Sequence, residues 1–147
     1  MLEGKGLHFG KDAKMVVPPA SADHGIVFKR TDVKGDQAYV KASFENVSKT
    51  YLRTQLTNSV GVSIITAEHI LAAFAGLGIH NALIELNEAE VPIFDGSSRI
   101  FVKAILEAGV VELEKKTKLY KVVKSIRVGN SDAWAELRPA NTFAIDF

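Results

Sequence analysis

The residues best suited to chemistry in this sequence are Glu68 and His69, which are adjacent in the segment TAEHILAAF. Neutral imidazole is a common zinc ligand, and a carboxylate beside the metal can act as the general base that takes a proton from an attacking water. Neighbouring residues on a helix point about 100° apart, so both side chains could face one cavity at a helix end. Two residues that merely meet solvent would give the same pair, and a second histidine four residues on is absent. The pair alone leaves a catalytic and a structural interpretation open.

A second candidate is the glycine-rich segment GKGLHFG, which carries His8. Its spacing, G-x-G-x-x-x-G, differs from the dinucleotide-binding fingerprint, and the pattern predicts neither a strand before it nor a helix after it. We interpret it as a glycine turn that uses positive φ angles. Two further histidines, His24 and His80, lie in the predicted turns SADHG and GIHN and are expected on the surface.

The composition narrows the classes of function. The chain has 147 residues, 47% apolar and 24% charged, with a net charge of +1. These values are typical of one folded domain, or one and a fraction, and exclude a coiled coil or a wholly disordered chain. The even charge balance speaks against nucleic acid as a partner. Cysteine is absent, and neither a membrane span nor a signal peptide is visible, so we expect a soluble cytoplasmic protein without a transmembrane segment.

The elements that must position Glu68 and His69 follow from the hydrophobic pattern. Short extended runs bounded by turn residues predict strands at 14–17, 25–30 and 38–44. Apolar residues at helical spacing predict a helix with Thr66 as its N-cap and Phe74 in the core, ended by Gly76 or Gly78.

A strand at 81–87 and a second helix at 98–108 follow in the sequence. The predicted apolar face of this helix carries Phe101 in the core, together with Val102, Ile105 and Leu106, and Gly109 ends it. The order of strands, helix, strand and helix predicts an α+β fold, a sheet with two helices packed on one face.

The composition changes after Glu114. The stretch EKKTK is a predicted linker, and LYKVVKSIRV, WAELRP and TFAIDF predict three further strands with no helix to cover them. We therefore expect two parts. Residues 1–114 form an N-terminal α+β domain that carries the Glu-His motif, and residues 115–147 form a linker and the first strands of a truncated second domain.

Five segments, taken in order, resemble one family, the UDP-3-O-acyl-N-acetylglucosamine deacetylases, which are the zinc amidases of lipid A synthesis. They are GKGLHFG, GIVFKRTD, TAEHILAAFAGLGIHNALIEL, EAEVPIFDGSSRIFVKAI and WAELRPANTFAIDF. The resemblance covers nearly the whole chain. It implies a fold of two similar domains, of which this chain holds the first, with the active site between them.

The resemblance also implies roles for single residues. His69 is implied as one of three Zn²⁺ ligands and Glu68 as the general base. The other two ligands, a histidine and an aspartate, are expected in the missing C-terminal domain beyond Phe147. Leu52 and His8 are similar in position to residues beside the substrate, although Leu52 could equally belong to the core.

The activity that the resemblance implies is hydrolysis of the 2-acetamido group of UDP-3-O-acyl-N-acetylglucosamine by a zinc-activated water, with release of acetate. We expect the chain to be inactive alone and to hold zinc poorly, because one imidazole competes weakly with water for the ion. Two alternatives stay open. One is a non-catalytic α+β module that binds a sugar nucleotide or a protein without metal, and the other is a divergent fusion whose first half serves another deacylation.

Overall fold

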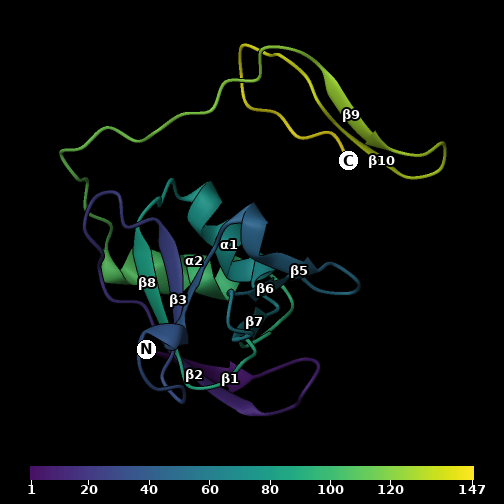
Figure 1. The fold of residues 1–147 in the computed structure, drawn as a ribbon. Coiled ribbons are helices and arrows are strands. Elements are labelled where there is room, and N and C mark those ends of the chain that lie inside the picture. Colours follow the sequence, from purple (N-terminus) through teal and green to yellow (C-terminus); the bar gives the residue numbers. More distant parts are fainter. The chain divides into compact units, whose positions relative to one another are not determined.

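Five strands form one mixed sheet in the computed structural model, which describes residues 1–147. They are β1 (Leu2–Lys5), β2 (Asp12–Val16), β3 (Ile26–Arg30), β4 (Tyr39–Lys41) and β8 (Ala82–Leu86). Their order across the sheet is β1-β2-β8-β3-β4, and Figure 1 shows β8 and β3 side by side. Neighbours run antiparallel except β8 and β3, which are parallel. The predicted strands at 14–17, 25–30, 38–44 and 81–87 correspond to β2, β3, β4 and β8.

The two faces of this sheet differ in polarity because side chains alternate along each strand. Alternate residues of β8, from Ala82 to Leu86, are buried. Glu85, between them, points to the other face and pairs with Lys29 of β3 at 2.8 Å. In β4, Val40 is buried while its two neighbours are exposed. One face therefore forms the core and the other meets solvent, as a sheet covered on one side requires.

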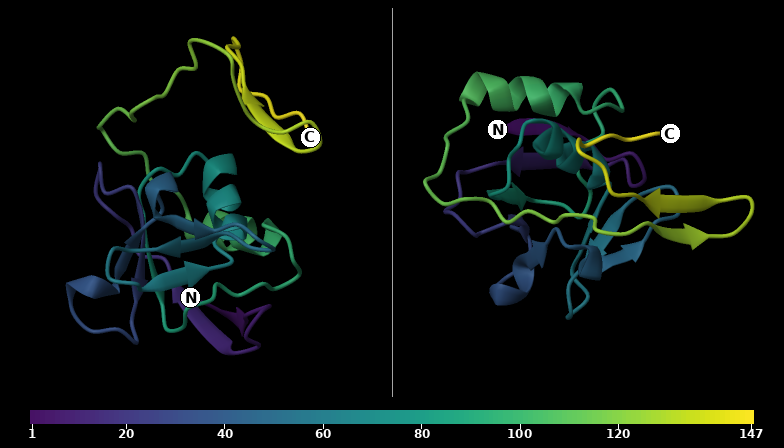
Figure 2. Two further views of the ribbon diagram at one scale, coloured as in Figure 1. Left: turned by 45° about the vertical axis from the view of Figure 1, so that its right-hand side comes forward. Right: turned by 90° about the horizontal axis from the view of Figure 1, so that it is seen from above.

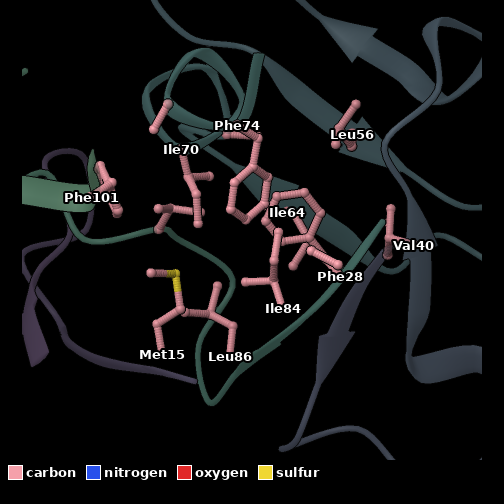
Figure 3. Close-up of a cluster of buried hydrophobic side chains, with 14 of the residues drawn as sticks. Met15, Phe28, Val40, Leu56, Ile64, Ile70, Phe74, Ile84, Leu86 and Phe101 are labelled. Carbon is pink, nitrogen blue, oxygen red and sulfur yellow. The ribbon is translucent and has the colours of Figure 1, made fainter. Parts of the chain in front are cut away.

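Two helices, α1 (Glu68–Gly76) and α2 (Arg99–Ala108), cover the apolar face and contact each other. Phe74 of α1 and Phe101 of α2 belong to the same buried cluster as Phe28 and Ile84 of the sheet (Figure 3). The predicted fold class, a sheet with two helices on one face, is confirmed, as are both phenylalanines in the core. Neither helix is long and apolar enough to cross a membrane.

The start of α1 differs from the prediction. Thr66 is not the N-cap; Ala67 occupies that position, and no side chain caps the helix. Thr66 is buried with φ +60°, a left-handed conformation that β-branched residues rarely adopt. Its hydroxyl donates to Glu90 at 3.0 Å and accepts no hydrogen bond from the N–H groups of the helix. The chain thus turns sharply between strand and helix, and the helix begins at Glu68.

The apolar face of α2 is narrower than predicted. Phe101 is buried and Val102 and Ile105 pack against the core, but Leu106 is 60% exposed. Residues five apart on a helix are separated by about 140°, so Leu106 lies away from the direction of Phe101. Gly109 ends the helix with φ +88°, as predicted.

A second, antiparallel sheet of three short strands was not predicted (Figure 2). Its strands are β5 (Val47–Lys49), β6 (Gln55–Thr57) and β7 (Ser63–Ile65). Short 3-10 helices at Asp36–Ala38 and Phe44–Asn46 precede β4 and β5. Leu56 and Ile64 of this sheet enter the same core as the helices, so the small sheet completes the hydrophobic cluster that holds α1.

Residues 116–147 form a separate compact unit, and Met1–Lys115 form the other. The second unit contains a hairpin of β9 (Ile126–Gly129) and β10 (Trp134–Leu137), in which Arg127 stacks over the Trp134 ring and pairs with Glu136. Two predictions are wrong here: TFAIDF forms no strand, and LYKVV adds none before Ile126. Both segments are exposed except for Val122, and neither has a neighbouring strand to supply hydrogen bonds.

Candidate active site

Glu68 and His69 form the first turn of α1, and both are half-buried. The left-handed Thr66 and the buried Ala67 carry the chain from β7 into this turn. Thr66 and Ala67 therefore set the position of the pair, and Thr66 holds the strained conformation. Strain of this kind persists only where the surrounding structure holds it.

Glu68 is held by one of its two carboxylate oxygens. Its Oε2 accepts a hydrogen bond from the backbone N–H of Thr54 at 3.0 Å. The same segment accepts a hydrogen bond from Ala67 N at the Thr54 carbonyl, so the start of α1 and residue 54 are joined twice. No protein group bonds to Oε1 of Glu68. A carboxylate that is oriented through one oxygen keeps the other able to accept a proton.

The backbone of His69 is fixed by a hydrogen bond, whereas the Nδ1 atom of its ring has no hydrogen-bond partner. The Ser98 hydroxyl donates to the carbonyl oxygen of His69 at 2.8 Å. The ring nitrogen Nδ1 is buried without a hydrogen-bond partner, and the only other such side-chain atom is Nε of Arg53. Arg53 is next in the sequence to Thr54, which bonds to Glu68, and His69 is next to Glu68 itself. Both unpartnered atoms therefore belong to residues adjoining the Glu68–Thr54 contact. Buried polar atoms without partners are rare and point to groups that a ligand or another part of a protein satisfies.

The chain holds no complete metal site of its own. An unpartnered imidazole suits zinc, which binds neutral histidine nitrogen. No group of three His, Cys, Asp or Glu side chains is close enough to hold an ion. The residues present therefore fit one zinc ligand, His69, with a neighbouring carboxylate, and a complete site needs ligands from elsewhere.

The structure places Leu52 and His8 differently. Leu52 is 74% exposed with φ +57°, which rules out the alternative that it belongs to the core. It lies two residues before Thr54, on the segment that bonds to Glu68. His8 has an exposed side chain, and its backbone N–H donates to Glu90. Of the other histidines, His80 is exposed as expected, whereas His24 is only partly so.

The glycine segment differs from the prediction of a turn with positive φ angles. Only Gly10 has a positive φ, +64°. Gly4 lies in β1, and a Cβ atom on it would stand 2.7 Å from the Phe94 ring. A Cβ atom on Gly6 would stand 2.3 Å from the Glu90 carboxylate. Gly4 and Gly6 are needed because a side chain at either position would collide with Phe94 or Glu90, and not because of their backbone conformation.

The sequence predictions missed three supporting residues: Thr54, Glu90 and Ser98. Thr54 acts through its backbone, which no side-chain pattern can reveal. Glu90 offered one signal, since it is a charged residue directly before the apolar run VPI. Ser98 was expected only as the start of a helix.

The turn before α2 is organised by Asp95. Its Oδ1 accepts hydrogen bonds from the hydroxyl of Ser97 at 2.8 Å and from the Ser97 N–H at 3.0 Å. Because these bonds favour the charged form, they hold the pKa of Asp95 below its ordinary value. The turn brings Ser98 to the His69 carbonyl.

Proteins named UDP-3-O-acyl-N-acetylglucosamine deacetylase match this chain along almost its whole length. That of Blochmanniella pennsylvanica (strain BPEN) is 45% identical over 144 residues, which is 98% of this chain and 48% of the relative. Those of Pseudoalteromonas atlantica and Aliivibrio fischeri are 44% and 41% identical over 98% and 99% of this chain, and it covers 47% and 48% of them. The chain thus spans about half the length of these relatives. The sequence family described as UDP-3-O-acyl N-acetylglycosamine deacetylase matches residues 1–147. The chain therefore belongs to the UDP-3-O-acyl N-acetylglycosamine deacetylase family.

Proposed function

We propose that this chain forms the first half of a zinc-dependent hydrolase, in the cytoplasm, that removes acetate from the 2-acetamido group of UDP-3-O-acyl-N-acetylglucosamine. The observation that carries the proposal is the Glu68–His69 pair at the start of α1. One residue is an oriented carboxylate with a free oxygen, and the other is an imidazole with an unpartnered buried nitrogen. The names of the relatives supply the substrate class.

The proposed roles divide the work between the two residues. A bound zinc ion would supply its usual chemistry, lowering the pKa of a water molecule to about 7. His69 provides one ligand for the ion. Glu68 stays fixed through Thr54 N–H and accepts the proton of the attacking water at its free oxygen. Leu52 and His8 are proposed to contact the substrate.

The remaining parts of the site are proposed to come from a second domain. Residues 115–147 would then be its linker and first strands, and the other two zinc ligands would lie in the region of the relatives that this chain does not cover. The exposed hairpin β9–β10 supports this, because a two-stranded ribbon is marginally stable without further structure.

The test compares Glu68→Gln and His69→Ala in a protein that carries both halves. Glutamine is nearly isosteric and still accepts from Thr54 N–H, but it cannot take up a proton. Glu68→Gln should therefore keep its zinc and lose about 10²–10⁴-fold in kcat, whereas His69→Ala should lose zinc and activity together. Zinc content, melting temperature and kcat are measured for each.

A purely structural role for Glu68 gives a different result. A carboxylate in the first turn of a helix stabilises it by about 0.3–1 kcal/mol, so Glu68→Gln would lower the melting temperature slightly and leave turnover unchanged. Near-parental kcat with zinc in place would rule out the base assignment. A parent protein with both halves that binds no zinc and releases no acetate would favour the alternative, a non-catalytic binding module.

A further inference from the structure

Glu90 is a buried carboxylate that the roles proposed above do not use. It is 2% exposed, and Thr66, also 2% exposed, is the only other buried polar residue. No cation pairs with Glu90 in any ion pair of the chain. A charge buried without a counter-ion is costly unless hydrogen bonds satisfy it. The hydrogen-bond partners of Glu90 therefore have to account for its burial.

Three donors surround Glu90, and we call this arrangement the Glu90 clamp. Oε1 accepts from the backbone N–H of His8 at 2.8 Å and from the Thr66 hydroxyl at 3.0 Å. Oε2 accepts from the backbone N–H of Phe9 at 2.9 Å. In the sequence, His8, Phe9 and Thr66 are separated from Glu90 by 82, 81 and 24 residues. The clamp thus ties the loop of the β1–β2 hairpin to the turn before α1.

Each side of the clamp is built around the carboxylate. On one side, Gly6 has no side chain, and a Cβ atom there would meet Glu90 Oε2 at 2.3 Å. On the other side, Thr66 holds φ +60°, and its backbone neighbour Ile65 is bridged to Glu90 through hydrogen bonds with Ala89 and Val91. A strained conformation at a β-branched residue persists only where contacts determine it.

We infer that Glu90 is a positioning residue that holds His8, Glu68 and His69 in one arrangement. This inference rests on the proposed function. Glu90 reaches His8 directly through the backbone, and it reaches Glu68 and His69 through Thr66, which precedes them by two and three residues. It touches no reacting group. Its role is to fix the position of the hairpin loop relative to the turn before α1.

Two variants test the clamp in a protein with both halves. Glu90→Gln places an amide NH₂ group against N–H or O–H donors, so at least one hydrogen bond is lost. Thr66→Val removes the hydroxyl donor and keeps the branched shape. Each should lower kcat about 10–100-fold, the range typical of losing a residue that orients an active site. The zinc content should stay within about threefold of the parent, since His69 itself is unchanged, and KM should change by a smaller factor than kcat.

Two further variants serve as controls. Glu88→Gln makes the same change two residues away, at an acid that pairs with Lys11 of the same hairpin, and should leave kcat unchanged. Thr66→Ser keeps the hydroxyl and should recover most of the kcat that Thr66→Val loses. All activities are measured well below the melting temperature of each variant. If Glu90→Gln and Thr66→Val lower only the melting temperature and keep parental kcat, the inference is overturned.

Amide hydrogen exchange separates this inference from the proposed function. The N–H groups of His8 and Phe9 should be protected in the parent and exchange faster in Glu90→Gln, whether or not the protein has deacetylase activity. A parent without activity would contradict the proposed function and leave the exchange result to decide the clamp. Equal protection of both amides in parent and Glu90→Gln would overturn the clamp even in an active enzyme.

Discussion

Among the single residues, Asp95 shows how hydrogen bonds within one turn help to position a residue far away in the sequence, His69. Its carboxylate holds Ser97, and the next residue, Ser98, donates to the carbonyl of His69. The charged form of Asp95 is the form that accepts both bonds, which is why its pKa is lowered. The protonation state of an exposed turn is thereby connected to the first turn of α1.

Asp95 should contribute to stability only while it is charged. Because the folded-state pKa lies below the ordinary value of about 3.9, its contribution is complete above that value and is lost as the pH falls through the folded-state pKa. Asp95→Asn should remove this dependence, so its free energy of unfolding should fall less steeply than that of the parent below about pH 4. Urea unfolding at a series of pH values measures both slopes.

A second substitution checks the cause. Ser97→Ala removes the hydroxyl that contributes most to the lowered pKa of Asp95. It should reproduce part of the flattening seen with Asp95→Asn. Identical slopes in the parent and both variants would contradict the assignment.

The sequence could single out the Glu68–His69 pair and the helix that carries it, but not the groups that hold the pair in place. Glu68 and His69 are adjacent in the sequence, and the helical pattern around them indicates where they lie. The groups that hold them, Thr54 N–H and the Ser98 hydroxyl, come from 14 and 29 residues away. Such contacts depend on the whole fold, and a hydroxyl or a backbone N–H has many equally plausible partners in a sequence.

At the level of elements, the helices were predicted because their apolar periodicity is long. The strands of the small sheet were not, since β5, β6 and β7 have three residues each and the pairing of β5 with β6 is irregular at Val47 and Lys49. Strands this short are defined by tertiary contacts and not by local pattern. The segment TFAIDF shows the converse, because an apolar alternation without a neighbouring strand does not form one.

The helix α2 offers a matched pair of substitutions. Phe101 is buried and its ring meets the Phe94 ring edge-on at 5.2 Å, whereas Leu106 on the same helix is exposed. Phe101→Ala should lower the free energy of unfolding by about 3–5 kcal/mol through loss of buried surface and the cavity left behind. Leu106→Ala should change it by no more than about 0.5 kcal/mol. Chemical denaturation measures both.

The comparison depends on the contrast between the two positions. Equal losses for Phe101→Ala and Leu106→Ala would show that the helix presents a different face to the sheet. A phenylalanine at the same depth in α1 provides a third point, and Phe74→Ala should resemble Phe101→Ala.

On the scale of the whole molecule, the zinc site is expected to be incomplete. The chain of 147 residues offers His69 but no group of three potential ligands. A single imidazole competes weakly with water for the ion. The purified chain should therefore retain far less than one zinc per molecule after dialysis, as measured by atomic absorption, and should release no acetate from the substrate.

The matched control is His69→Ala in the same chain. If the small amount of zinc that remains is adventitious, the variant and the parent should retain the same amount. Retention of one zinc per parent chain, lost in His69→Ala, would contradict the prediction. Size-exclusion chromatography of that sample would then show whether a second copy supplies ligands.

The position of β8 has a consequence for synthesis on the ribosome. Although β8 is the last strand of the five-stranded sheet in the sequence, it lies between β2 and β3. The hairpin of β1 with β2 and the pair of β3 with β4 share no hydrogen-bonded edge until it is inserted. During translation, the two pairs must therefore wait with open edges until residue 86 has left the exit tunnel. Unpaired strand edges in folding intermediates are prone to aggregation, so this interval is when the nascent chain is most exposed to wrong association.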